Sequence, residues 1–244
     1  MRMIKEKEED KMKKATVLCV GLVLGLAALA SADSLTVTPA AAMGGTNYGL
    51  EVYHDNTDKS YVQDNTPDME TTYRATFLFN TSDVTLSNPR NFRQSLFRAI
   101  GTNPNPGVGA CDPDPAFQYA LVQLWLYQTG GVGQFSNLQL WGKGNQCGDQ
   151  GTVRIPINNN QDYRVCMEYQ TGSGGTGFVA LAVTDPASAC PTSGDPSWVS
   201  VSFSNSLTAI DIIRMGTTAT NTFGAGETCT FNYDEFASFR TLSP

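Results

Sequence analysis

Short runs that alternate apolar and polar residues recur along the sequence after residue 46. Tyr73, Ala75 and Phe77, for example, alternate with Arg74 and Thr76. A β-strand places successive side chains on opposite faces, so this pattern predicts half-buried strands rather than helices. We expect strands at 48–53, 71–79, 95–100, 118–127, 137–141, 152–157, 162–169, 177–183, 198–204, 207–215 and 228–239.

The connections between these runs are rich in turn-forming residues, as at 103–107 and 171–177. Many short strands joined by short turns predict an all-β fold, an antiparallel two-sheet jelly-roll β-sandwich. No break in composition divides the runs, so we expect one sandwich domain over 47–244. Residues 33–46 are interpreted as a linker or a first edge strand.

The N-terminal segment is typical of a secretory signal. A basic stretch at 11–14 precedes an apolar run at 15–30, and the small residues Ala30 and Ala32 follow. The apolar run is shorter than the roughly 20 residues that span a bilayer. We therefore predict a signal peptide at 1–32, cleavage before Asp33, and a secreted or extracytoplasmic mature chain without membrane insertion.

The charge balance argues against some partners. Six of the 16 Lys and Arg and four of the 23 Asp and Glu lie in residues 1–32, so residues 33–244 carry a net charge of −9. Nucleic acids and anionic membranes attract basic surfaces, so no nucleic-acid partner is expected.

Five cysteines follow the predicted signal peptide, an odd number. In an oxidising compartment they would form two disulfides and leave one thiol, which would allow self-association through an intermolecular bridge. The sequence leaves the pairing open. The disulfide candidates are Cys111, Cys147, Cys166, Cys190 and Cys229.

Two segments resemble the concanavalin A-like lectin/glucanase superfamily, in particular bacterial laminin-G-like domains. The first is an acidic turn within 61–70 that leads into Tyr73-Arg-Ala-Thr-Phe77. The second runs from 210–216 through a Gly/Thr loop to 231–240. The resemblance implies a jelly-roll fold whose members include sugar-binding modules, glycosidases, polysaccharide lyases and adhesion modules.

The same resemblance implies a structural calcium ion. Related modules use an Asp of the closing strand as a ligand, and Asp234 occupies that position. Asp64, in the acidic turn at 64–68, would supply a further oxygen, as calcium prefers. The alternative is that Asp234 caps or pairs within the sandwich.

The sequence contains no recognised pair of catalytic carboxylates. Glycosidases of the superfamily carry Glu-x-Asp-x-x-Glu on one strand, whereas 162–169 holds only Glu168 inside it. The lyases use sets of Tyr, His, Arg and Gln, but the only histidine, His54, begins a polar turn at 54–58 and is expected to be solvated. These observations predict that the chain is not an enzyme.

Aromatic and polar residues alternate with apolar ones along the central strands, which predicts a ligand-binding face. Sugar rings stack on Trp and Tyr, and amides and charges bind their hydroxyl groups. The alternative is plain packing, because Trp is usually buried. The candidate residues are Gln123, Trp125, Tyr127, Gln139, Trp141, Arg154, Arg164 and Glu168.

The leading interpretation is a secreted, non-catalytic jelly-roll module that binds carbohydrate, either a glycan or a cell-surface polymer. One alternative is a structural or adhesive extracellular subunit. Another is a polysaccharide-degrading hydrolase or lyase.

Overall fold

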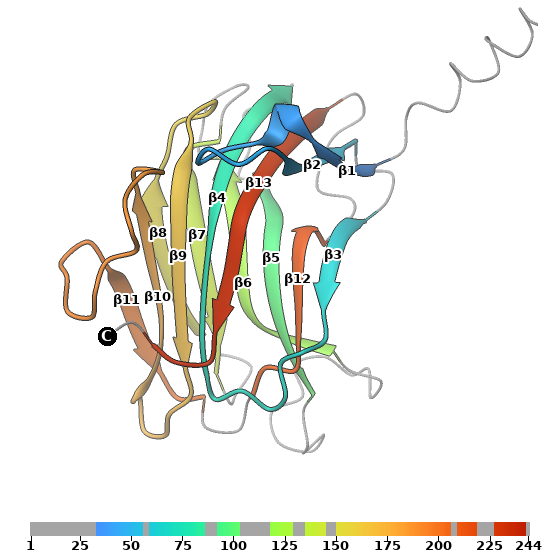
Figure 1. Ribbon diagram of the computed structural model, residues 1–244. Helices are drawn as coiled ribbons and strands as arrows, with labels where there is room; N and C mark the ends of the chain where they lie inside the picture. The colour runs from blue at the N-terminus through green and yellow to red at the C-terminus, as the bar shows by residue number, and fades with distance from the viewer. Residues whose placement is uncertain are drawn as a thin grey trace, which may run out of the picture. The chain divides into compact units, whose positions relative to one another are not determined.

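Two antiparallel β-sheets pack face to face, with β4 and β13 in one layer and β5, β6 and β7 in the other (Figure 1). The computed structural model describes residues 33–55, 59–85, 92–102, 118–128, 135–144, 150–205, 209–218 and 227–242. The elements are β1 (Ser34–Thr38), η1 (Pro39–Ala41), β2 (Gly49–His54), β3 (Ser60–Asp64), β4 (Thr72–Thr85), β5 (Phe92–Thr102), β6 (Gln118–Gln128), β7 (Asn137–Lys143), β8 (Gln150–Pro156), β9 (Tyr163–Gln170), β10 (Gly177–Thr184), β11 (Val199–Phe203), β12 (Ile212–Thr217) and β13 (Thr228–Phe239).

Within the described part of the chain, one sheet has seven strands and the other has six. The seven-stranded sheet has the order β1-β2-β13-β4-β9-β10-β11, and the six-stranded sheet has the order β3-β12-β5-β6-β7-β8. The predicted all-β, two-sheet antiparallel fold is confirmed. Most expected strands are present within a few residues, but β3 was not expected, and the run at 207–215 yields an isolated bridge at Ile210 followed by β12.

The core fills the space between the sheets and follows the alternation of the sequence. Phe79 on β4 lies against Phe231 and Tyr233 on β13, with ring centroids 6.1 and 5.4 Å apart. Phe135, which precedes β7, reaches the same cluster 6.3 Å from Phe231. On β7, the absence of a side chain at Gly142 leaves room for β11 of the facing sheet, because a Cβ at this position would lie 2.6 Å from the Phe203 ring.

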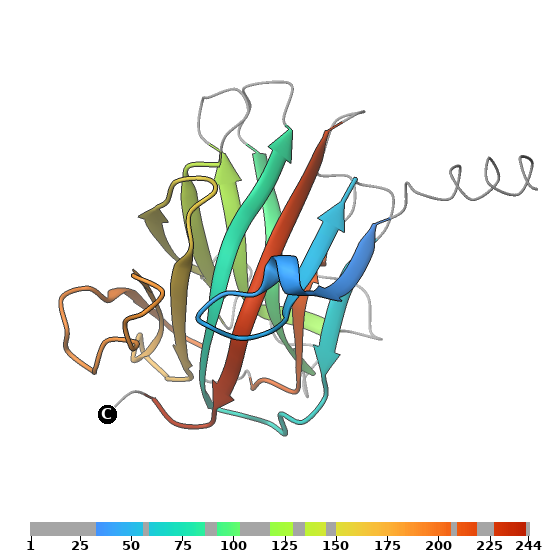
Figure 2. The same cartoon turned by 45° about the horizontal axis from the view of Figure 1, so that its top comes forward.

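Two segments cover the outer face of the seven-stranded sheet (Figure 2). The connection from β1 to β2 crosses β13 and is held by Met43, whose N–H donates to Asp234 at 2.7 Å. Residues 185–198 lie beside β9 and β10, and the disulfide Cys166–Cys190 ties them to β9. This covering explains why Leu78, on that outer face, is fully buried.

The structure shows one of the disulfide pairs that the sequence left open. Cys166 and Cys190 are bonded, which fits an oxidising, extracytoplasmic compartment. Cys229 is a buried thiol, and burial raises its pKa well above the ordinary value. Its burial makes it unsuited to an intermolecular bridge. Cys111, Cys147 and the predicted signal peptide lie outside the described residues.

In the described part of the chain, no helix is long and apolar enough to span a membrane.

Candidate functional site

The outer face of the six-stranded sheet gathers arginine, amide and aromatic side chains in rows that cross the strands. Val122, Leu124 and Leu126 of β6 belong to the core, so the alternate residues of this strand point outward. Strand register then defines the rows. We call the following set the basic face: Gln63, Arg93, Ser95, Arg98, Gln123, Trp125, Tyr127, Asn137, Gln139, Trp141, Thr152, Arg154 and Arg214.

A β-bulge places two arginines of β5 on this face. Arg93 and Arg98 are five residues apart, an odd spacing that would put them on opposite sides of a regular strand. The register of β5 against β6 shifts between Ser95 and Phe97, which restores both side chains to one side.

Trp125 lies beneath these arginines. The guanidinium carbons of Arg93 and Arg98 lie 4.8 and 5.8 Å from its ring centroid, and Trp125 is only 9% exposed. Cation–π contact therefore occupies the indole and orients the two guanidinium groups. Arg93 remains exposed. In this arrangement the arginines, more than the indole, are presented to a ligand.

Arg98 and Gln123 form an in-register pair with unused hydrogen-bonding atoms. They face each other across β5 and β6, and Arg214 lies opposite Arg98 on β12. Arg98 Nε and Gln123 Oε1 are buried and have no hydrogen-bond partner within the described chain. Burial, with Arg214 and Arg93 nearby, lowers the pKa of Arg98. This pair offers a buried donor and a buried acceptor within a positive environment.

Arg154 forms a second positive group at the other side of the basic face, on β8. Its guanidinium carbon lies 4.7 Å from the Tyr127 ring centroid, and its Nε donates to Gln139 Oε1 at 3.2 Å. Both partners are neutral, so they orient the charge without cancelling it. Arg154 is exposed.

The basic face contains six of the eight predicted binding residues, and Arg164 and Glu168 are not among them. Both lie on β9, in the seven-stranded sheet, and point away from the core on its outer side. Arg164 donates to Glu235 Oε2 at 2.7 Å and to the Pro186 carbonyl, which anchors the covering segment. The expectation of one shared surface for all eight residues is corrected, because the chain changes sheets after β8.

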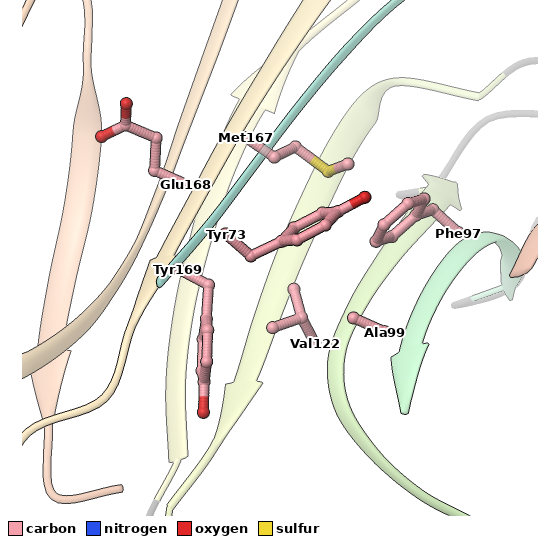
Figure 3. Close-up of a pocket in the computed structure, with 7 residues that line it drawn as sticks. All are labelled: Tyr73, Phe97, Ala99, Val122, Met167, Glu168 and Tyr169. Carbon is pink, nitrogen blue, oxygen red and sulfur yellow. The ribbon is translucent and has the colours of Figure 1, made fainter. Parts of the chain in front are cut away.

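The cavity that borders on Glu168 is small. A small cavity of ≈ 10 Å³ lies between the sheets, where Tyr73, Phe97 and Met167 converge while Glu168 points away (Figure 3). This volume is near the lower limit for a single water molecule, so it is too small for a sugar.

His54 is not the solvated loop residue that its polar surroundings predict. It ends β2 and is fully buried, and its Nδ1 lies 2.6 Å from Asp33 Oδ2. Asp33 also accepts from the Asp55 N–H at 2.7 Å. The polar residues that follow His54 indicate a turn, but His54 is the last residue of β2. Asp33, which precedes β1, hydrogen-bonds to its imidazole. His54 is therefore separate from the basic face.

The buried imidazole makes stability depend on pH. Burial lowers the pKa of His54, so on acidification through about 6.5 the unfolded chain takes up a proton that the folded chain resists. Unfolding is then favoured as pH falls. Burial also raises the pKa of Asp33. The folded chain therefore holds this proton more tightly than the unfolded chain, which favours folding as the pH falls through the range in which the carboxyl titrates.

We expect the melting temperature of the wild type to fall between about pH 7.5 and 6, and the fall to be smaller in His54→Gln. Differential scanning calorimetry of both proteins over this range measures the difference. Parallel pH profiles would show that His54 is not the group responsible.

The two carboxylates predicted to bind calcium lie in different sheets, and each accepts hydrogen bonds from the protein. Asp234 Oδ2 accepts from Met43 N–H and from the Thr46 hydroxyl, and its Oδ1 accepts from Glu235 N–H at 2.7 Å. Asp64, on β3, accepts from Thr66 N–H at 2.8 Å. Among the described residues, no group of three or more His, Cys, Asp or Glu could hold a metal ion. Calcium binding remains a prediction from the resemblance.

We expect Asp234→Ala to lower the free energy of unfolding by about 2 kcal/mol, because it removes a charged acceptor that holds the β1–β2 connection. Asp64→Ala should cost less than about 0.5 kcal/mol, since its one described partner is local. Urea titrations test both values. Repeating them with EDTA and with calcium tests the ion: a calcium-dependent stability lost in Asp234→Ala would mean that the carboxylate binds metal.

Comparison with known proteins identifies the fold. No protein-family model matches the sequence, and no curated protein matches it. Among solved structures, an endo-β-1,4-glucuronan lyase from the fungus Trichoderma reesei aligns over 87% of this chain and 89% of its own, with a TM-score of 0.59 and 15% identity. An alginate lyase A1-II′ aligns over 80% and 80%, with a TM-score of 0.51 and 10% identity.

The binding domain of a botulinum neurotoxin serotype D/C aligns over 87% of this chain but 45% of its own, with a TM-score of 0.52 and 8% identity. These neighbours share the two-sheet β-sandwich fold expected from the sequence. At such identities the likeness concerns the fold alone. The narrower resemblance to laminin-G-like domains remains a prediction.

The prediction that the chain is not an enzyme is contradicted by these neighbours and is corrected. Two of the similar solved structures are polysaccharide lyases, the glucuronan lyase and the alginate lyase. The prediction depended on the missing carboxylate pair and on the position of the single histidine. It did not consider the arginines of β5 and β12, which strand pairing places beside β6.

Proposed function

We propose that the protein is a polysaccharide lyase that binds an acidic polysaccharide across the basic face and cleaves it by β-elimination. The observation that carries the proposal is the charge of this face. Arg93, Arg98, Arg154 and Arg214 lie on it, and the set that defines it contains no Asp or Glu. A chain with net charge −7 thus concentrates positive charge where a sheet displays its side chains.

The Arg98–Gln123 pair supports an acidic sugar rather than a neutral one. Buried polar atoms without partners are rare and costly, and a ligand that satisfies them binds with corresponding specificity. A uronate carboxylate would accept from Arg98, while a neighbouring hydroxyl would donate to Gln123. In β-elimination, neutralising a uronate carboxylate favours removal of the adjacent C5 proton, because negative charge develops there; at Tyr127, Arg93 and Arg154 would neutralise it.

Tyr127 is our candidate for proton transfer. Its phenol lies between Arg93, opposite it on β5, and Arg154, over its ring. In β-elimination from a 4-linked uronate, a base removes the C5 proton, the C4–O bond breaks, and a C4=C5 double bond forms. The leaving glycosidic oxygen takes up a proton, so no water is consumed. As a phenolate, the tyrosine would remove the C5 proton, and the phenol formed by that step would return a proton to the leaving oxygen.

The test is incubation of the full chain with glucuronan and alginate, with a neutral β-1,4-glucan as control. We expect cleavage of an acidic polymer, detected as ultraviolet absorption by the unsaturated product, and none of the neutral polymer. Tyr127→Phe should reduce cleavage about 100-fold while affinity stays within about twofold. Absence of product from every acidic polymer, or equal cleavage of the neutral glucan, would contradict the proposal.

A further inference from the structure

A row of four oxygen-bearing side chains crosses the outer face of the seven-stranded sheet, in the sheet opposite the basic face. It runs over the neighbouring strands β2, β13 and β4 to the start of β9 (Figure 1). Strand register places Asn232 opposite Glu51 on one side and opposite Asn80 on the other. The Nδ2 of Asn80 then donates to Oδ1 of Asp162, the residue before β9. We call these four residues the amide–carboxylate row.

The two amide oxygens of this row are buried and lack a hydrogen-bond partner. Asn232 lies between the core residues Phe231 and Tyr233, so its side chain points outward, yet it is only 8% exposed. Its Oδ1 has no partner within the described chain, and neither has the Oδ1 of Asn80, whose Nδ2 is used by Asp162. Buried carbonyl oxygens without partners cost free energy, so two of them on paired residues indicate a shared ligand.

The charge of the row indicates that this ligand is a cation. Glu51 and Asp162 flank the two amides, and both are half-buried. Within the described part of the chain, neither forms an ion pair with a basic side chain. Arg164, which follows Asp162 on the same side of the sheet, is used by Glu235 and by the Pro186 carbonyl. A divalent cation would satisfy both amide oxygens and neutralise both carboxylates.

We propose that the amide–carboxylate row is a calcium site. Calcium binds carboxylates and amide carbonyls in irregular geometries and completes its coordination with water, whereas magnesium demands near-ideal octahedral geometry. Residues paired across antiparallel strands have Cβ atoms about 5 Å apart, so both amide oxygens can reach one ion. Each carboxylate lies one strand spacing further out, about 4.8 Å, on a side of its own.

This site differs from the pair of carboxylates that the family resemblance implies. Asp234 lies two residues along β13 from Asn232, and its oxygens accept from Met43, Thr46 and Glu235. The amide–carboxylate row holds two carboxylates and two amides, a set with fewer than three acidic ligands. An ion bound there joins β2, β13, β4 and the start of β9, and so stabilises the seven-stranded sheet.

The experiment measures calcium binding by the full chain after treatment with EDTA and dialysis. Isothermal titration calorimetry with calcium chloride should give a dissociation constant of about 0.1–1 mM, as in extracellular calcium-binding modules. Calcium at ten times that concentration should raise the melting temperature by about 3 °C or more. Magnesium chloride at the same concentration is the control for ionic strength and should raise it by less than about 1 °C.

Substitutions in the row separate an ion site from a packing defect. Asn232→Leu removes the amide at nearly constant volume, so it should abolish calcium binding without lowering the melting temperature in EDTA. Glu51→Gln and Asp162→Asn should each weaken calcium binding about tenfold or more. Asn232→Asp adds a third carboxylate, so it should lower the melting temperature in EDTA and regain it in calcium.

Asp64→Asn is the matched control, because it removes one negative charge from β3 in the other sheet. It should leave the calcium affinity within about twofold. Absence of calcium binding, equal effects of calcium and magnesium, or unchanged affinity in Asn232→Leu or in Glu51→Gln would overturn the site. Loss of binding in Asp234→Asn with binding retained in Asn232→Leu would also overturn it and place the ion at Asp234. None of these results depends on cleavage of a polysaccharide.

Discussion

Arg98→Ala should lower the affinity for an acidic polysaccharide about 100-fold or more, and cleavage should fall at least as far. Truncating one partner of a buried, charge-assisted contact typically costs 2–5 kcal/mol, and about 2.7 kcal/mol corresponds to 100-fold. Arg98 has the largest expected effect because it is the arginine of the basic face whose Nε is buried without a partner in the described chain. Arg98→Lys should recover only part of the loss, since a lysine lacks the forked donors.

Gln123→Glu separates ligand binding from folding at the same position. The new carboxylate would lie opposite Arg98 and supply the missing counterion from within the protein. We therefore expect thermal stability to be kept or raised while affinity for the acidic polymer falls. Retained affinity in a Gln123→Glu protein would refute the assignment of Arg98 and Gln123 as a carboxylate site.

Phe231→Ala should lower the free energy of unfolding by about 3–5 kcal/mol. The ring is fully buried between Phe79 and Phe135, where the two sheets meet, and its loss leaves a cavity that the sheets cannot close. Urea denaturation followed by Trp fluorescence measures the change.

Phe236→Ala is the control within the same strand, because Phe236 is 36% exposed and lacks such neighbours among the aromatic contacts of the core. Its cost should stay below about 1 kcal/mol. Similar costs for the two substitutions would mean that the sheets do not pack as described.

The outward side chains of the central strands could be predicted from the sequence because alternation is a local property. Gln123, Trp125 and Tyr127 share a side of β6 whatever lies next to it. The all-β class follows from the same pattern. What alternation cannot give is the sheet to which a strand belongs. Arg164 and Glu168 were therefore assigned to the wrong surface.

Three of the four arginines of the basic face, Arg93, Arg98 and Arg214, could not be found from local patterns. Arg93 and Arg98 have opposite parity, and the bulge that reconciles them depends on pairing with β6. Arg214 is more than 110 residues away from both and meets Arg98 only through the pairing of β12 with β5. Only these strand pairings bring the arginines of an acidic chain together in one positive site.

The most direct test of the basic face uses the indole N–H signals of the protein's three tryptophans in a ¹⁵N–¹H correlation spectrum, assigned with single Trp→Phe variants. Trp125 and Trp141 lie on the basic face, whereas the Trp198 indole donates to the carbonyls of Pro191 and Thr192 beside the other sheet. The account predicts that a hexameric oligoglucuronate shifts the signals of Trp125 and Trp141 and leaves that of Trp198 in place. A shift confined to Trp198, or no shift at saturating oligomer, would contradict it.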